Sequence, residues 1–217
     1  MIDRFDLVVF DWDGTLVDST ALIAAAIRQA AADLGLTVPD FERASHVIGL
    51  GLADALARAV PELPSSRFPE FAARYRAHYL AGENQIALFP QVRGLLDALR
   101  ERGVPLAIAT GKTRAGLARA LDSAGLALHF SATRCADETA PKPDPAMLFE
   151  LAGELDVAVS RMVMIGDTTH DLQMAAAAGV AAVGVTYGAH PRVQLAALEP
   201  LALLDSVPAL RGWLIPG

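Results

Sequence analysis

Two aspartates stand one residue apart at the end of an apolar run near the start of the chain. The segment "LVVFDWDGTLVDST" (7–20) places Asp11 and Asp13 directly after four apolar residues, which predict a buried strand. Neighbouring carboxylates repel each other and shift each other's pKa values unless a cation lies among them. The spacing therefore raises the question of which partner needs two acids at a strand exit.

Polar residues also follow other apolar runs further along the chain. Thr110 and Gly111 follow "VPLAIA", and Lys142 lies in the loop "APKPDP". Asp167 and Asp171 follow "RMVMI" in the segment "GDTTHD". In an open parallel sheet, ligands bind at the carboxyl ends of the strands, so we expect these side chains to converge at one edge.

The converging set has the chemistry of a phosphoryl-transfer site. Oxygen-only ligands at a partly open site suit Mg²⁺ better than zinc, which prefers His and Cys. A hard cation, a lysine and a hydroxyl together match the three anionic oxygens of a phosphoryl group. A carboxylate nucleophile also divides phosphoryl transfer into two easier steps through an aspartyl phosphate. Attack by Asp11 on a dianion is opposed by charge, which Mg²⁺ and Lys142 would offset.

Short apolar runs predict the strands that must position these residues. Four runs lack the alternation of a half-exposed strand, as expected for a parallel sheet covered on both faces: "DLVVF", "VPLAIAT", "RMVMIG" and "AAVGVT". A fifth run, "SATRC", is a weaker candidate. Helical patterns lie between the runs, namely "QVRGLLDALRERG", "TRAGLARALDSAGL", "PDPAMLFELAGEL" and "HDLQMAAAAG". The alternation predicts a doubly wound, Rossmann-like α/β core with a mostly parallel sheet.

The residues after the first motif break this rhythm. Between about residues 19 and 82 no segment has a convincing strand pattern. Three segments there are helical, and the first begins with a Ser or Thr suited to a helix cap: "STALIAAAIRQAAADLGL", "GLADALARAV" and "FPEFAARYRAHYL". We therefore expect an all-α cap, residues 16–86, inserted into an α/β core made of residues 1–15 and 87–217.

Composition narrows the class of protein. The 217 residues are 53% hydrophobic and carry a net charge of −7, which indicates a packed core and argues against general binding to nucleic acid or anionic membrane. The single cysteine, Cys135, predicts a reducing compartment, and we expect it to pack in a strand. The sequence shows no pattern of a secretory signal or a membrane-spanning segment. We expect a cytoplasmic protein that is a monomer or a weak homodimer.

Four segments, "DWDGTLVDS", "ATGK", "PKPDP" and "GDTTHD", resemble in this order the four motifs of the haloacid dehalogenase-like hydrolases. The chain is most similar to the phosphoglycolate phosphatase-like branch, which has a helical cap after the first motif. The resemblance covers essentially the whole chain. It implies a Mg²⁺-dependent phosphatase that acts on a small phosphorylated metabolite, phosphoglycolate-like or a sugar phosphate, through an aspartyl-phosphate intermediate.

The resemblance also implies catalytic roles for the matching residues. It assigns Asp11 as the nucleophile, and Asp13 as the acid that protonates the leaving oxygen and then activates water. The hydroxyl of Thr110, the backbone of Gly111 and the ammonium of Lys142 would bind the phosphoryl oxygens. Thr110 and Lys142 are thereby counted with the two aspartates among the catalytic residues.

The metal ligands implied by the resemblance are Asp11, Asp167 and Asp13, the last through its backbone carbonyl. Asp171 is expected to lie behind these ligands, although a first-turn helix acid explains it as well. Trp12, between the two motif-one acids, is expected to point away into packing. These ligands make Mg²⁺ the expected cofactor.

Other readings stay open for the reaction. A sugar-phosphate mutase of the same superfamily would return the phosphoryl group to substrate instead of water. A phosphoacceptor switch like a response-regulator receiver also combines acids, Thr, Lys and Mg²⁺, but its phosphorylated Asp lies on a middle strand and it has no helical cap. A haloacid dehalogenase needs neither Mg²⁺ nor a proton donor such as Asp13.

Several further polar residues have simpler explanations. We expect Lys112, Arg114 and His170 to face solvent, and His190 to lie in a turn at a helix start. In the helical segment, glycines at 49 and 51 permit close backbone approach. Four residues there fit either recognition of the leaving group or a charged helix face: Arg74, Arg76, His78 and Tyr79.

Overall fold

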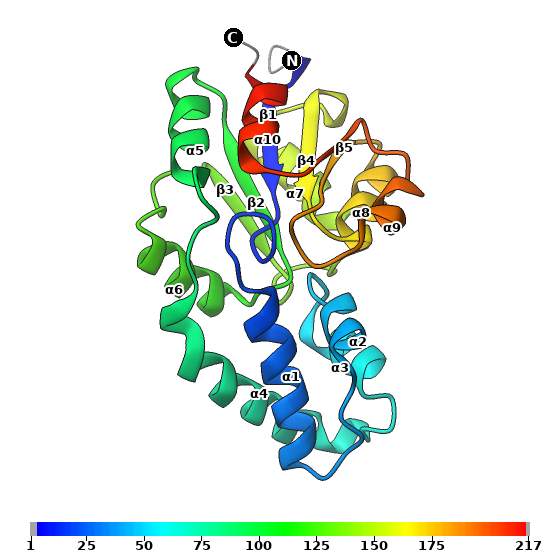
Figure 1. The fold of residues 1–217 in the computed structure, drawn as a ribbon. Helices are drawn as coiled ribbons and strands as arrows, with labels where there is room; N and C mark the ends of the chain where they lie inside the picture. The colour runs from blue at the N-terminus through cyan, green and yellow to red at the C-terminus, as the bar shows by residue number, and fades with distance from the viewer. Residues whose placement is uncertain (1–3, 216–217) are drawn as a thin grey trace.

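A six-stranded sheet forms the centre of the molecule (Figure 1). The computed structural model describes residues 4–215, and the strand order is β3-β2-β1-β4-β5-β6 with parallel pairing throughout. The strands are β1 (Leu7–Phe10), β2 (Leu106–Thr110), β3 (Ala132–Cys135), β4 (Met162–Gly166), β5 (Ala181–Val185) and β6 (Ala202–Leu204). The predicted doubly wound α/β fold is confirmed.

Helices cover both faces of this sheet (Figure 1). Alternate residues of β1 point to opposite faces, so Val8 and Phe10 join one hydrophobic cluster and Leu7 and Val9 join the other. The first cluster is completed by α5 (Val92–Glu101), α6 (Arg114–Ala124) and α10 (Val207–Leu214), and the second by α7 (Ala146–Leu155) and α8 (Thr169–Ala178). Because both faces are covered, β1, β4 and β5 lack the alternation of a half-exposed strand, as the sequence predicted.

Local sequence signals fix the ends of the core helices. Thr113 caps α6 by accepting a hydrogen bond from the backbone of Gly116, and the helix ends at Gly125 with φ +61°. Gly179 ends α8 in the same left-handed conformation. All four predicted core helices are confirmed. The sequence analysis did not predict α10, which is capped by Ser206, or the short α9 (Arg192–Ala196).

Four α-helices lie beyond the end of the sheet where β1 leads into α1 (Figure 1). They are α1 (Thr20–Asp33), α2 (Phe41–His46), α3 (Leu52–Ala59) and α4 (Phe68–Gly82), joined by short 3₁₀ turns at 65–67 and 83–85. They share a hydrophobic cluster of their own, centred on residues such as Ile27, Leu56 and Phe71. Between residues 20 and 85 the structure contains no strand, in agreement with the sequence.

The two segments that connect these helices to the core run side by side. The backbone N–H of Asp18 donates to the carbonyl of Ala87, and that of Phe89 donates to the carbonyl of Leu16, each at 3.0 Å. Val17 and Leu88 form an antiparallel bridge between the same segments. The pairing closes the helical region at its base; the cap boundaries at residues 16 and 86 stay a prediction.

One expected helix cap is wrong, and one short helix was not predicted. Ser19 occupies the position before α1, but its hydroxyl donates to Asp13 Oδ1 at 2.7 Å and not to the helix backbone. The six-residue α2 was not predicted, because a helix of this length has no readable apolar period; Asp40 caps it. Trp12 is 1% exposed in the core, as expected.

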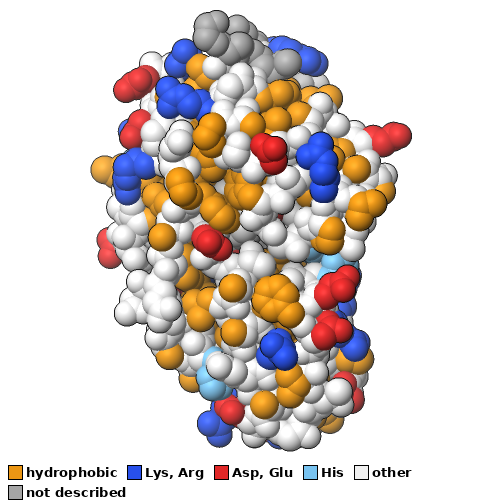
Figure 2. Space-filling model, viewed as in Figure 1, with side chains coloured by type: hydrophobic (Ala, Val, Ile, Leu, Met, Phe, Trp, Pro, Cys, Tyr) orange, Lys and Arg blue, Asp and Glu red, His pale blue; other side chains and the backbone are white. Residues whose placement is uncertain are grey.

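The surface gives a coarse picture of charge. On the face in Figure 2, acidic and basic side chains are interspersed, and hydrophobic side chains gather near the junction of the sheet and the helical region. None of the helices within residues 4–215 is long and apolar enough to cross a membrane.

Candidate active site

Two of the predicted acids meet at the carboxyl ends of neighbouring strands. Asp11 follows β1 and Asp167 follows β4, and these strands pair directly, so that the backbone N–H of Asp11 donates to Ile165 at 2.9 Å. Asp171 joins them from the first turn of α8. Ligand oxygens of the three carboxylates lie within 4.8 Å of one another, and all three residues are fully buried. The strand order thus converts distant sequence positions into one acidic cluster.

Lys142 lies between two of these acids. Its Nζ atom is 2.6 Å from Asp11 Oδ1 and 2.6 Å from Asp171 Oδ1, and its side chain is fully buried. The loop that carries it follows β3. Burial opposes the charge of Lys142, but the two carboxylates outweigh this and raise its pKa above the ordinary value for lysine. The ammonium is therefore a permanent positive charge inside the site.

The carboxylate of Asp171 contacts both the start of α8 and Lys142. Its Oδ2 accepts hydrogen bonds from the backbone N–H and the hydroxyl of Thr168, at 3.0 and 2.7 Å, which completes a capping box at the start of α8. Its Oδ1 accepts a hydrogen bond from Lys142 Nζ at 2.6 Å. The helix-cap reading is confirmed, and the same carboxylate lies close to Asp11 and Asp167. Its expected place behind the metal ligands stays a prediction. A Cβ at Gly166 would lie 2.3 Å from the Cβ of Asp171, so only glycine fits there.

Asp167 is held by a tight cradle. Thr15 Oγ1 and the backbone N–H of Ala189 each donate to its carboxylate at 2.7 Å. A Cβ on Gly14 or on Gly188 would lie 2.2 Å from Asp167 Oδ2, so both glycines are needed for the backbone to approach. Burial, and then the charge of Asp171, raises the pKa of Asp167 to about 7 in spite of these hydrogen bonds.

The electrostatics of the cluster fit a divalent cation. Burial raises the pKa of Asp11 well above its ordinary value; Lys142 opposes this, whereas Asp171 and Asp167 add to it. Asp11 Oδ2 is buried and has no hydrogen-bond partner among the described residues. An unpaired carboxylate oxygen beside other buried acids is what a hard cation with oxygen ligands would satisfy. Asp11, Asp167 and Asp171 could each offer it one oxygen.

Asp13 occupies a separate environment. Its Oδ1 accepts from the hydroxyl of Ser19 at 2.7 Å, and its Oδ2 lies 3.1 Å from Lys112 Nζ. Its side chain is not part of the three-carboxylate cluster, so the contact with metal through its backbone carbonyl stays a prediction. Asp11 pairs with Lys142, whereas Asp13 pairs with Lys112 and Ser19. The two neighbouring carboxylates therefore have different environments, as two acids with different roles in catalysis require.

Lys112 was expected to face solvent, and this is wrong. Its side chain is 11% exposed; besides pairing with Asp13, its ammonium donates to the hydroxyl of Tyr79 on α4 at 2.9 Å. The composition of the sequence could have pointed to Lys112 as a site residue. Only two of the 18 Lys and Arg residues are lysines, Lys112 and Lys142, and both lie at this site.

Thr110 and Gly111 lie where the sequence placed them, at the end of β2. Thr110 is fully buried, and its hydroxyl accepts from the backbone N–H of Lys112 at 3.2 Å. A Cβ on Gly111 would lie 2.6 Å from the carbonyl oxygens of both Gly49 and Leu50. The expected close approach at Gly49 is thus found, and it places the 48–52 segment directly over the site.

A histidine cluster joins the helical region to the core beside the site. His46 stacks on His190 with ring centroids 4.3 Å apart, and the Nε2 atoms of His170 and His190 each lie 3.0 Å from the backbone oxygen of His46. His170 was expected to face solvent, but it is 3% exposed. Burial, and then His170, lowers the pKa of His190 to about 4. Burial thus favours the neutral form of His170 and His190, and the three rings pack α2 against the core.

Two other simple explanations agree with the structure. Cys135 is buried at the end of β3, where burial raises the pKa of its thiol to about 12, so it packs and is not reactive. Arg114 is partly exposed and pairs with Glu138 at 2.6 Å.

The chain is similar to known proteins over most of its length. Residues 8–185 match the family model described as haloacid dehalogenase-like hydrolase. The chain belongs to the haloacid dehalogenase-like hydrolase family. A protein of Dickeya dadantii named "Probable phosphatase IndB" is 38% identical, with 92% of this chain and 89% of that protein covered. A phosphoglycolate phosphatase of Agrobacterium fabrum is 32% identical, with 94% and 90% covered.

Solved structures agree with this assignment. A crystal structure from Haemophilus somnus, described as a predicted phosphoglycolate phosphatase, superposes with a TM-score of 0.83 at 30% identity and covers 94% of this chain and 95% of that one. The resemblance stated from the four motifs is confirmed. So is the predicted enzyme class, a haloacid dehalogenase-like hydrolase of the phosphatase type.

Lys142 should stabilise the folded protein in a way that depends on pH, because its ammonium is buried against two carboxylates. In Lys142→Met, Asp11 loses the cation that opposes the effect of burial on its pKa, so it is forced to hold a proton in the folded state. The unfolded protein releases this proton at lower pH, so the variant's loss of stability should grow as the pH rises, to about 3–5 kcal/mol at pH 8. Urea unfolding in EDTA at pH 5.5 and pH 8 measures it.

The control is Arg67→Met, which breaks an exposed ion pair with Glu70 on one helical turn. Its effect should stay below about 1 kcal/mol at both pH values. A Lys142→Met loss that is equal at the two pH values would contradict the buried-charge account.

Proposed function

We propose that the protein is a Mg²⁺-dependent phosphatase that hydrolyses a small phosphorylated metabolite through a phosphoaspartate on Asp11. One observation carries the proposal: Asp11 Oδ2 is buried and has no hydrogen-bond partner within residues 4–215, while the other oxygen of the same carboxylate lies against Lys142. One of these two oxygens would attack phosphorus, and the other would bind the cation. The acidic neighbours supply the reason for a cation.

The reaction has two halves. In the first, a carboxylate oxygen of Asp11 attacks phosphorus, the bond to the leaving oxygen breaks, and Asp13 gives its proton to that oxygen. In the second, Asp13 takes a proton from water as the water attacks the phosphoaspartate. Inorganic phosphate leaves and the Asp11 carboxylate is restored, so atoms and charges balance over the cycle.

Positive charge makes this attack possible. Lys142 lies against Asp11 and would neutralise part of the phosphoryl charge, while the hydroxyl of Thr110 and the backbone of Gly111 would donate to its oxygens. Bound Mg²⁺, held by Asp11, Asp167 and the backbone of Asp13, would supply further charge to the phosphoryl oxygens. The hydrogen bonds to Asp167 and Asp13 would hold these two carboxylates in position before the substrate binds.

The substrate enters between the core and the helical region. The 48–52 segment lies over Gly111, so a bound phosphoryl group would be shielded from bulk water. Relatives named phosphoglycolate phosphatase support a small phosphorylated compound, phosphoglycolate-like or a sugar phosphate. The cytoplasmic location and the monomeric or weakly dimeric state stay predictions.

Asp11→Asn should reduce phosphate release by roughly a thousandfold or more, because an amide cannot form the phosphoaspartate. Phosphate release from a panel of phosphorylated metabolites, with Mg²⁺ and with EDTA, measures it. Asp18→Asn is the matched control, since Asp18 is exposed and lies outside the cluster. Wild type no faster than Asp11→Asn on every phosphoester would refute the proposal, and turnover that required a bisphosphate activator would support the mutase instead.

Mg²⁺ should stabilise the protein more at pH 8 than at pH 5. The pKa of Asp167 in the folded protein is raised to about 7, so folding retains a proton there that the unfolded chain releases near pH 4. Metal-free stability therefore falls as the pH rises through this window, and a cation that replaces the proton acts most strongly above it.

Thermal unfolding with saturating Mg²⁺ and with EDTA tests this. At pH 8 the midpoint should rise by about 5–10 °C, and at pH 5 by much less. Asp167→Asn should abolish the difference, while Asp18→Asn should keep it. An equal or larger shift at pH 5 would show that Mg²⁺ does not compete with protons at this cluster.

A further inference from the structure

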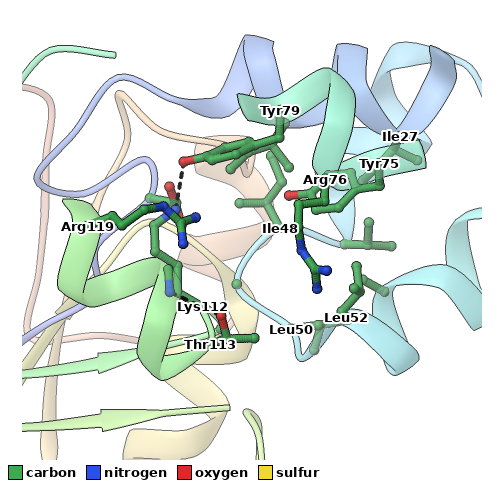
Figure 3. Close-up of a pocket in the computed structure, with 17 residues that line it drawn as sticks. Ile27, Ile48, Leu50, Leu52, Tyr75, Arg76, Tyr79, Lys112, Thr113 and Arg119 are labelled. Carbon is green, nitrogen blue, oxygen red and sulfur yellow. Dashed lines mark hydrogen bonds and ion pairs between the residues drawn. The ribbon is translucent and has the colours of Figure 1, made fainter. Parts of the chain in front are cut away.

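A pocket opens between the core and the helical region next to the acidic cluster (Figure 3). Its volume is about 130 Å³, which is room for a ring or a short branched chain and not only for a water molecule. Asp13, Gly111 and Lys112 line its inner end. The leaving group of a phosphomonoester held for attack by Asp11 would therefore extend into this space.

The wall of the pocket away from the core is apolar. Figure 3 shows Ile48, Leu50 and Leu52 from the 48–52 segment, with Tyr75 of α4 and Ile27 of α1 beside them. Tyr75 is set against this wall, and burial raises the pKa of its hydroxyl. A two-carbon leaving group offers little surface to such a wall, whereas a larger apolar body would bury it.

Three cationic side chains line the same pocket, and two of them are already paired. Lys112 is held by Asp13 and Tyr79, and Arg119 lies 3.6 Å from Glu83. Arg76 makes no hydrogen bond or ion pair with any residue of the range 4–215. Its guanidinium extends from α4 toward the apolar wall near Leu52 (Figure 3). It is the cation available to a ligand.

The spacing along α4 sets where that cation lies. Tyr79 fixes the helix to the core through Lys112, and Arg76 precedes it by three residues, about 4.5 Å back along the helix axis. The neighbouring arginine, Arg74, is exposed and does not line the pocket. The order from the site outward is therefore phosphoryl group, apolar wall, guanidinium.

We infer that the substrate is a phosphomonoester whose leaving group carries an apolar body and a second anionic group that binds Arg76. This inference rests on the proposed phosphatase function. Apolar contact with the wall around Leu52 would supply affinity for the body, and a charge-assisted hydrogen bond to the guanidinium would select the anionic end. Phosphoglycolate has the anion but lacks the body.

Three phosphomonoesters separate these contributions: phosphoglycolate, phenyl phosphate and 4-(carboxymethyl)phenyl phosphate. The two phenols have nearly the same acidity, so their rates compare binding and not leaving-group chemistry. In the wild type, kcat/KM should be highest for 4-(carboxymethyl)phenyl phosphate and should exceed that for phenyl phosphate by about tenfold. Arg76→Ala should reduce this ratio to about two or less, Arg76→Lys should retain part of it, and Arg74→Ala should leave it unchanged.

The apolar wall is tested with Leu52→Ala, which should lower kcat/KM for both aryl phosphates about tenfold relative to phosphoglycolate. A wild-type preference for phosphoglycolate, or a ratio that does not respond to Arg76→Ala, would overturn the inference. If Asp11-dependent, Mg²⁺-dependent hydrolysis is still seen, only this inference fails. If no phosphomonoester is hydrolysed in that way, the proposed function fails with it.

Discussion

The buried ion pairs of Lys142 with Asp11 and Asp171 are the interaction on which the site depends. Three carboxylates lie within 4.8 Å without access to water, an arrangement that repulsion and desolvation both oppose. One ammonium held at 2.6 Å from two of them offsets part of this cost. The rest of the cost raises the pKa values of Asp11 and Asp167, and one oxygen of Asp11 has no hydrogen-bond partner in the described part of the chain. The site is thus organised around charge that the protein alone leaves incompletely balanced.

Backbone geometry and the helical region build on this cluster. Glycines at 14, 166 and 188 let the chain pass within contact distance of Asp167 and Asp171, where any Cβ would clash. Above the cluster, Lys112 joins Asp13 of the core to Tyr79 of α4, so the acid expected to move protons is connected to the helical region. The side chain of Lys112 therefore contacts both the helical region, at Tyr79, and Asp13.

The sequence predicted what depends on local pattern and missed what depends on partners in space. Continuous apolar runs predicted β1, β2, β4 and β5 because both sheet faces are buried, while the three half-buried residues of β6 carried no such signal. The motif residues Asp11 and Lys142, far apart in the sequence, lie together as the strand-end argument expected, while their catalytic roles stay predictions. The burial of Lys112 and of the histidine cluster could not be read, since it is created by residues of α2 and α4 that the topology brings over the core.

A crystal structure with Mg²⁺ and beryllofluoride, which stands in for the phosphoryl group of a phosphoaspartate, tests the central claim most directly. The account predicts beryllium bonded to a carboxylate oxygen of Asp11, with Lys142 and Thr110 against the fluorides and Mg²⁺ bound by Asp11 and Asp167. Beryllofluoride on another residue, or Mg²⁺ bound away from Asp167, would contradict it.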